Sequence, residues 1–273
     1  MGHDKLRKFA ENETFACLLQ PSAEDLLADG YFNLRDHAMK GRWNVDMFHG
    51  PEDAPLVLEL GCGKGEYTID LAQRCPSSNH VGVDIKGARL WKGAKYATEH
   101  ALGNVAFLRT RIEFITALFA PGEVSEVWLT FSDPQPRSEN SRLSSPLFLE
   151  RYRYFMKKGG IVHLKTDSRF LHEYTKAVCE ANSLEVLCCT EDLYGADASV
   201  PDAVREVQTF YERMFLDQGY KINYLAFRID HEGEYMHPSS FDEQYWRERE
   251  GYRQLFGRDT AETRRQKIKA SEG

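Results

Sequence analysis

From residue 56 onward, short apolar runs alternate with stretches whose apolar residues recur at helical spacing. The run over 56–60 ends in glycines, and a helical pattern over 66–74 follows it directly. Buried strands that alternate with helices are typical of a mostly parallel sheet with right-handed crossovers. The predicted strands are 56–60, 80–84, 105–108, 124–131, 161–165, 184–190 and 220–229. The predicted helices are 66–74, 86–101, 144–155, 168–181 and 206–218.

Length and composition favour a single large domain with extended ends. The chain has 273 residues, of which 42% are hydrophobic and 12% aromatic, so a substantial core can be buried. Residues 1–50 are polar and interrupted by glycine and proline, which predicts an N-terminal extension with short helical pieces. We expect the domain itself to span 51–230 and a charged tail to occupy 231–273, with a loop-like region over 191–205.

Several classes of protein are disfavoured by composition. The six cysteines form no CxxC pair, which fits reduced thiols, and the nine histidines show no zinc-ligand spacing, so no metal is expected. No stretch approaches the roughly 18 apolar residues of a membrane span, and the N-terminus lacks the apolar run of a secretory signal. A net charge of -7 argues against an extended surface that coats nucleic acid, although it allows a local basic patch. We expect a cytoplasmic protein.

A glycine-rich loop follows the first predicted strand. Gly61, Gly63 and Gly65 let the backbone turn sharply and approach a ligand closely. Asp84 ends the next strand, near the offset of about 20 residues at which a carboxylate binds ribose hydroxyls. The pattern therefore indicates a cofactor that contains a nucleoside. The alternative is a tight strand-to-helix turn that binds nothing.

The identity of that cofactor follows from what the loop lacks. A dinucleotide fingerprint needs a glycine where Glu66 stands, and a phosphate-binding loop needs Ser or Thr where Gly65 stands. Glu59, at the entrance of the loop, would repel a pyrophosphate but suits the ammonium and sulfonium of S-adenosylmethionine. Alternatively, Glu59 is a solvated charge. The loop favours a methyl donor over a nucleotide phosphate.

A second loop follows the predicted strand over 124–131. Residues 130–137, at the end of this strand and in the loop, read Thr-Phe-Ser-Asp-Pro-Gln-Pro-Arg. In a doubly wound sheet this carboxyl end lies near the cofactor crevice. Two prolines stiffen the loop around Asp133. The alternative is an ordinary turn, since Asp-Pro is a common turn initiator.

Five motifs in order, ELGCGKG, GVDIK, TFSDPQP, HLKTD and TFYE, resemble those of the bacterial tRNA (guanine-N7-)-methyltransferase family. The resemblance covers about residues 55–229. It implies a Rossmann-like class I methyltransferase, with a seven-stranded mostly parallel sheet and helices on both faces. It also implies transfer of a methyl group from S-adenosylmethionine to N7 of a guanine in tRNA, guanine-46 of the variable loop being expected.

The resemblance also assigns site residues. Asp133 is the implied catalytic residue, which orients the base and stabilises charge. The implied cofactor residues are Glu59, Gly61, Gly63, Asp84, Arg111 and Asp133. The implied substrate residues are Arg137, Asp167, Thr209, Phe210, Tyr211 and Glu212.

Two departures from the family pattern bear on these roles. Arg111 stands where many members carry an acidic cofactor residue, so a backbone contact is the alternative to a side-chain contact there. Gln135 stands where many members carry tryptophan, and the basic run that follows is thinner. The remaining positive charge expected to face tRNA is carried by Lys5, Arg7, Lys8, Lys40, Arg42, Arg137, Arg142 and the tail over 264–269.

Some alternatives stay open at the level of sequence. Asp167 is placed to cap a helix that begins near Ser168, and Glu212 is placed to be a solvated charge on a helix face. For the whole protein, the rivals are a class I methyltransferase that acts on a small molecule or a protein, and a non-catalytic module that binds S-adenosylmethionine or RNA. The sequence does not decide between a monomer and a homodimer.

Overall fold

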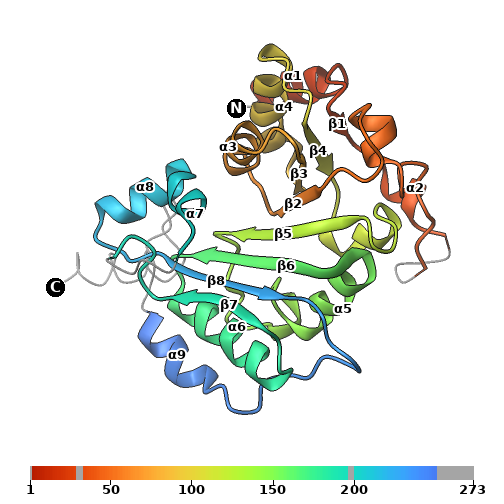
Figure 1. The fold of residues 1–273 in the computed structure, drawn as a ribbon. Helices are drawn as coiled ribbons and strands as arrows, with labels where there is room; N and C mark the ends of the chain where they lie inside the picture. Colours follow the sequence, from red (N-terminus) through yellow and green to blue (C-terminus); the bar gives the residue numbers. More distant parts are fainter. Residues whose placement is uncertain (1, 29–32, 196–199, 251–273) are drawn as a thin grey trace.

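The computed structural model describes residues 2–28, 33–195 and 200–250, and these form a mixed α/β fold around one sheet (Figure 1). The eight strands of the described residues lie in the order β1-β4-β3-β2-β5-β6-β8-β7. They are β1 (Leu18–Leu19), β2 (Leu56–Leu60), β3 (Asn79–Asp84), β4 (Val105–Arg109), β5 (Val124–Thr130), β6 (Met156–Thr166), β7 (Val186–Thr190) and β8 (Asn223–Arg228).

The predicted fold class is confirmed, and all seven predicted strands are present. The first six strands of the sheet order run parallel, whereas β8 pairs antiparallel with both β6 and β7. The expected number of seven is wrong by one, because β1 adds a short edge strand in which Leu18 pairs with Phe107. Two residues are too few to show a period-2 pattern, so no sequence signal predicts this strand.

Short and long helices connect the strands. They are α1 (Gly2–Asn12), α2 (Ala23–Leu26), the π-helical turn η1 (Trp43–Met47), α3 (Glu66–Arg74), α4 (Gly87–Glu99), the 3₁₀ turns η2 (Ile112–Ala117) and η3 (Glu139–Ser141), α5 (Pro146–Phe155), α6 (Arg169–Ala181), α7 (Asp202–Glu206), α8 (Phe210–Asp217) and α9 (Glu243–Glu250). The predicted helix over 206–218 is wrong at its start. Thr209 accepts from the Glu212 N–H and begins a new helix there, α8, while α7 lies within the predicted loop.

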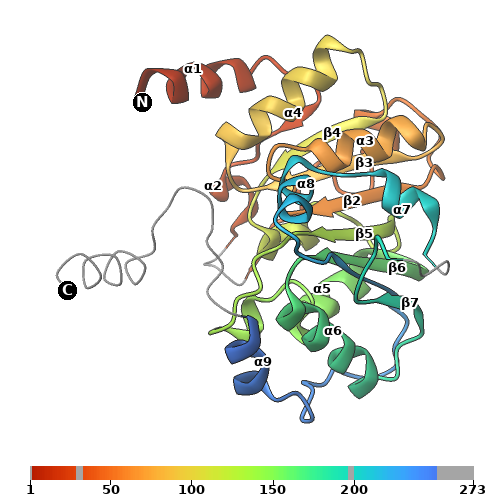
Figure 2. The same ribbon diagram turned by 90° about the vertical axis from the view of Figure 1, so that its left-hand side faces the viewer.

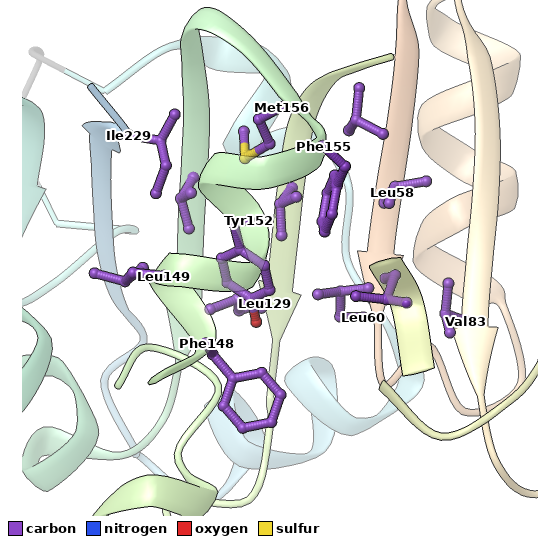
Figure 3. Packing of buried hydrophobic residues seen from close by; sticks show 14 of the residues in the cluster. Leu58, Leu60, Val83, Leu129, Phe148, Leu149, Tyr152, Phe155, Met156 and Ile229 are labelled. Atoms are coloured by element: carbon purple, nitrogen blue, oxygen red, sulfur yellow. The ribbon is translucent and has the colours of Figure 1, made fainter. Parts of the chain in front are cut away.

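Alternate residues of the strands bury against different helices, so the sheet has a helical layer on each face (Figure 2). Leu58 and Leu60 pack in the larger core with α5 and α6, and Figure 3 shows Tyr152 and Phe155 of α5 directed at these strands. Val57, one residue away in register, packs with α3 and the region of α7. The core therefore lies on both sides of β2 and fixes the direction of every residue in that strand.

The first 50 residues contribute to the same core. The indole of Trp43 is fully buried, stacks on Phe119 with ring centroids 5.0 Å apart, and donates from Nε1 to the Leu118 carbonyl at 2.8 Å. Leu26 is also buried in that cluster. The chain before residue 51 therefore covers one face of the sheet as well as adding β1 to its edge.

The sheet reverses its order between β2 and β5, which are paired neighbours although β3 and β4 lie between them in the sequence. Loops at the carboxyl ends of strands on either side of such a reversal diverge, and the crevice between them is where ligands bind in open α/β sheets. The glycine loop follows β2, and the loop that carries Asp133 follows β5. The topology therefore brings the two predicted motifs together.

If the N-terminal segment is part of the cooperative fold, Trp43→Ala will lower the free energy of unfolding by about 3–5 kcal/mol, because it leaves a large cavity and removes a buried hydrogen bond. Denaturant titration measures the change. Val45→Ala, at a position 40% exposed in the same turn, is the control and should stay within about 0.5 kcal/mol of the unchanged protein. Equal stability for both variants would show that this segment does not contribute to the fold.

Candidate active site

The glycine loop turns through three left-handed glycines between β2 and α3. Gly61, Gly63 and Gly65 have φ values of 80°, 59° and 73°. A Cβ at Gly65 would lie 2.3 Å from the ring of Phe107, so only glycine fits there. A Cβ at Gly61 or Gly63 would meet no atom within 4 Å, so these two positions face open space. The loop therefore packs tightly on one side and leaves its backbone accessible on the other, as close approach of a cofactor requires.

Asp84 lies directly against this loop, at the end of β3. Its carboxylate is buried and accepts hydrogen bonds from the Gly63 N–H at 2.9 Å and from the Lys86 N–H at 2.7 Å. A carboxylate has about four acceptor sites, so it can also accept from the hydroxyls of a ribose. The structure brings Asp84 and the glycine loop together, as the spacing predicted.

Glu59 lies beneath the loop rather than in solvent. The side chain, on β2, accepts hydrogen bonds from the backbone N–H and hydroxyl of Thr68 on α3 and from the hydroxyl of Thr130 on β5. Only 4% of the residue is exposed, so the alternative of a solvated charge is wrong. Burial raises the pKa of Glu59 to about 7, although the hydrogen bonds from Thr130 and Thr68 act in the opposite direction.

Thr68 and Thr130 were missed by the sequence analysis. Each had a weak signal: Thr130 is the last residue of β5 before the Asp-Pro loop, and Thr68 lies on the buried face of α3. Threonines are common in strands and helices, so nothing distinguishes these two from the others in the sequence. The contact of Thr130 with Glu59 depends on the pairing of β2 with β5, and that of Thr68 depends on the packing of α3 on β2; the sequence pattern predicts neither.

The loop after β5 is strained at two positions. Phe131 and Gln135 have φ values of 49° and 45°, in the left-handed region that bulky side chains disfavour. Asp133 lies between them, is exposed, and accepts a hydrogen bond from the Gln135 N–H at 3.0 Å. Strained backbone of this kind clusters at functional sites, and here it presents the Asp133 carboxylate outside the carboxyl end of the sheet.

Asp167 follows β6, the neighbour of β5. The proposed alternative that it caps the next helix is wrong, because Ser168 is the N-cap of α6 and accepts from the Leu171 N–H at 3.0 Å. Asp167 and Asp133 therefore follow neighbouring parallel strands whose carboxyl ends meet at the same edge of the sheet.

Glu212 is fully buried, so its interpretation as a solvated charge is wrong. It forms an ion pair with the buried ammonium of Lys165 at 2.8 Å and accepts from the hydroxyl of Tyr194. Lys165 also donates to the carbonyls of Val204 and Val207 at 2.9 and 2.7 Å. Burial lowers the pKa of Lys165, and the carboxylate of Glu212 opposes that shift. Lys165 was not among the predicted site residues, because a lysine at the end of a predicted strand is usually exposed and its partner Glu212 is distant in the sequence.

This ion pair holds the start of α8 next to the glycine loop. Phe210 and Tyr211 are 53% and 43% exposed, and the Lys64 ammonium lies 5.7 and 5.9 Å from their ring centroids. Glu66, at the start of α3, accepts from the Phe210 N–H at 3.0 Å. Two motifs far apart in the sequence, the glycine loop and the segment Thr209 to Glu212, therefore meet in the fold.

The predicted basic residues differ in how they are placed. The prediction that Arg142 faces tRNA is wrong, because its side chain is fully buried. Arg111 pairs with Glu113 at 3.2 Å, whereas Arg137 is exposed. Ion pairs to carboxylates three or four residues away involve Arg7, Lys8, Lys40 and Arg42, and the Lys40 side chain is only 12% exposed. The tail over 264–269 lies outside the described residues.

Metal-ligand clusters and membrane-spanning helices can be searched for in the described residues. Within 2–28, 33–195 and 200–250, no three His, Cys, Asp or Glu side chains gather in a way that could hold a metal ion. The same described part of the chain contains no helix that is both long and apolar enough to cross a membrane.

Comparison with known proteins gives consistent matches. A family model described as a putative methyltransferase matches residues 53–225. A tRNA (guanine-N(7)-)-methyltransferase of Christiangramia forsetii is 48% identical over 228 residues, which cover 83% of this chain and 98% of that protein. One of Bacteroides thetaiotaomicron is 46% identical over 241 residues, which cover 87% and 90%. Among solved structures, the 16S rRNA methyltransferase KamB matches with a TM-score of 0.49 at 19% identity, over 64% of this chain and 88% of that one.

The raised pKa of Glu59 predicts a pH-dependent stability. Between its ordinary value of 4.5 and about 7, the folded state binds more protons than the unfolded state, so stability falls as pH rises through this range. Glu59→Gln keeps the shape and removes the titration. Its stability relative to the unchanged protein should therefore rise by about 2.5 kcal/mol between pH 5 and pH 8.

Denaturant titrations at a series of pH values measure this difference. Glu99→Gln, which removes an exposed carboxylate at the end of α4, is the control and should give a difference independent of pH. A constant difference for Glu59→Gln as well would mean that Glu59 is already ionised at pH 5 in the folded protein.

Proposed function

This chain belongs to the tRNA (guanine-N(7)-)-methyltransferase family, and from that premise we propose that it transfers the methyl group of S-adenosylmethionine to N7 of a guanine in tRNA. The guanine at position 46 of the variable loop is the proposed target. The observation that carries the proposal is that the glycine loop and the Asp133 loop follow neighbouring strands, β2 and β5, on either side of the point where the sheet reverses its order. We also propose a cytoplasmic location, since the substrate is tRNA.

The residues around the glycine loop fit S-adenosylmethionine. The open space at Gly61 and Gly63 lets the cofactor approach the backbone, and Asp84 offers acceptors to ribose hydroxyls. We propose that Glu59 supports the loop from below and, when ionised, favours the cationic amino-acid end of the cofactor. Because Arg111 pairs with Glu113, we propose that it contacts the cofactor through its backbone. When bound, S-adenosylmethionine supplies a methyl group on a sulfonium.

Asp133 has an orienting and electrostatic role in this proposal. Guanine N7 carries a lone pair and no proton, so the attack on the methyl carbon needs no general base. The Asp133 carboxylate accepts from the N1–H and exocyclic amine of guanine, which excludes adenine. Positive charge develops on the purine as the methyl group is transferred, and a nearby carboxylate stabilises it. Alignment of the two reactants accounts for much of the remaining acceleration.

The other predicted substrate residues surround Asp133 in this proposal. Asp167, after the neighbouring strand, binds the base or its ribose, and the exposed Arg137 binds a tRNA phosphate. Phe210 and Tyr211 present exposed rings beside Lys64, while Thr209 and Glu212 act indirectly, by holding the start of α8. Extrusion of the target base from its stack would bring it to this site.

We propose that residues 51–230 form the methyltransferase domain and that 1–50 and 231–273 are extensions of it. The match of the family model to residues 53–225 supports this division. The buried Trp43 indicates that the first extension completes the core of the domain rather than forming a separate unit.

A direct experiment tests the proposed function. Unmodified tRNA is incubated with the protein and S-adenosylmethionine labelled in the methyl group, and its nucleosides are analysed by mass spectrometry. We expect label in 7-methylguanosine, and cleavage at methylated guanine should place it at position 46. Label in a protein or small molecule with none in tRNA would favour the rival methyltransferases. Cofactor binding without transfer to any of these would favour a non-catalytic module.

Asp84→Ala should weaken binding of S-adenosylmethionine by about 10- to 150-fold, since a hydrogen bond to a charged group contributes about 1.5–3 kcal/mol. Asp84→Asn, which keeps one carbonyl oxygen, should have an affinity between those of the unchanged protein and Asp84→Ala. Titration calorimetry measures the affinity, and Asp217→Ala at an exposed position of α8 is the control. Unchanged affinity in folded Asp84→Ala would remove the ribose contact from the proposal.

Asp133→Ala and Asp133→Asn should keep cofactor affinity and lower single-turnover methylation of tRNA by roughly 10²- to 10³-fold, Ala at least as much as Asn. Asn keeps an acceptor but removes the charge. Because N7 has no proton, the rate should show no ionisation of a base at Asp133 beyond the loss of its charge in acid. Ser138→Ala, in the same exposed loop, is the control. Full activity in Asp133→Ala would leave Asp133 as a turn residue.

A further inference from the structure

Helix α9, the last described helix, lies along α6 (Figures 1 and 2) and contacts the loops that carry Asp133 and Asp167. Arg247 donates from Nη2 to the Pro136 carbonyl of the Asp133 loop at 2.6 Å. Glu250 accepts from the Phe170 N–H at 2.8 Å and from the hydroxyl of Ser168, at the first turn of α6 beside Asp167. One short helix therefore bonds to two loops that follow different strands.

A third contact passes through Arg142. The buried guanidinium lies over the rings of Phe170 and Tyr174 on α6, 4.7 and 4.3 Å from their centroids. Its Nε donates to the Gln135 carbonyl at 3.3 Å, and its Nη2 lies 3.2 Å from the carboxylate of Glu243 on α9. A buried cation needs a counter-charge, and α9 supplies it. Through Arg142, the loop of Asp133, helix α6 and helix α9 are held in one arrangement.

The Asp133 loop depends on such contacts because its backbone is strained. Phe131 and Gln135 are both in the left-handed region, which persists in bulky residues only where surrounding structure holds it. Asp133 itself is exposed, and the hydrogen bond that it accepts comes from Gln135 within the same loop. The direction of its carboxylate therefore follows from the backbone between residues 131 and 136. Contacts from α9 reach that backbone at Gln135, through Arg142, and at Pro136.

We infer that α9 is a positioning element of the substrate site, in which Glu243, Arg247 and Glu250 hold the Asp133 loop and the start of α6 in register. The inference rests on the proposed function, and it concerns a helix outside the residues 53–225 matched by the family model. These side chains touch neither base nor cofactor in this account. They fix the two aspartates relative to each other before tRNA arrives, which a geometry-dependent methyl transfer requires.

Paired variants on the same helix test this role. Arg247→Ala and Glu250→Ala remove contacts to the loops, whereas Arg249→Ala and Glu248→Ala change neighbouring exposed residues whose contacts stay within α9. With saturating tRNA and S-adenosylmethionine, the single-turnover rate should fall at least tenfold in the first pair and stay within twofold in the second. Affinity for S-adenosylmethionine should be unchanged in all four. Arg247→Lys, which can still donate to the Pro136 carbonyl, should recover most of the rate.

Hydrogen–deuterium exchange gives a readout that needs no activity. Exchange over residues 131–138 and 166–171 should be faster in Arg247→Ala and Glu250→Ala than in their controls, with the rest of the sheet unaffected. Unchanged exchange and unchanged rate in both variants would overturn the inference. Tighter tRNA binding with faster methylation by Glu250→Ala would also overturn it, because α9 would then compete with tRNA. If the unchanged protein methylates no tRNA, the proposed function fails, while the exchange data still decide whether α9 holds the loops.

Discussion

The buried carboxylate of Glu59 joins the three elements on which the site depends. It lies on β2, accepts from Thr68 on α3, and accepts from Thr130 at the end of β5. The glycine loop begins directly after β2, and the Asp133 loop begins directly after Thr130, so one side chain fixes the origins of both. Burial without these donors would cost far more than a typical hydrogen bond contributes, which makes the three contacts mutually dependent. With a pKa of about 7, its charge also changes near neutral pH.

The buried ion pair of Lys165 with Glu212 fixes a further part of the proposed site, the start of α8. Buried ion pairs contribute little net stability compared with apolar packing, but removal of one partner is strongly destabilising. Such a pair is therefore better understood as fixing an arrangement. Here it fastens the start of α8 to β6 and so places the rings of Phe210 and Tyr211 beside Lys64. Glu59 lies on β2 and Lys165 on β6, the strands on either side of β5, and Asp133 follows β5.

The sequence predicted those parts of the site that depend on local signals. Gly61, Gly63 and Asp84 belong to a strand–turn–helix pattern whose residues are near one another in the chain, and the structure brings them together as expected. The burial of Arg142 does not follow from local signals. An arginine in a polar loop is usually exposed. Nothing in the adjacent sequence indicates that its guanidinium lies over two rings of α6. The alternative of a solvated charge at Glu212 is wrong for the same reason, since its buried partner Lys165 is distant in the sequence.

Local sequence patterns are enough to predict the alternating strands and helices, the glycine loop, the order of the motifs and the resemblance that follows from them. These depend on periodicity and on backbone freedom, which are properties of short segments. The three-dimensional packing alone establishes which charged groups are buried, where the helix after residue 206 begins, and that α9 reaches the loops of Asp133 and Asp167. Those outcomes depend on partners brought together by strand order, and the free energy of burying a charge is set by its partners and not by its neighbours in the chain.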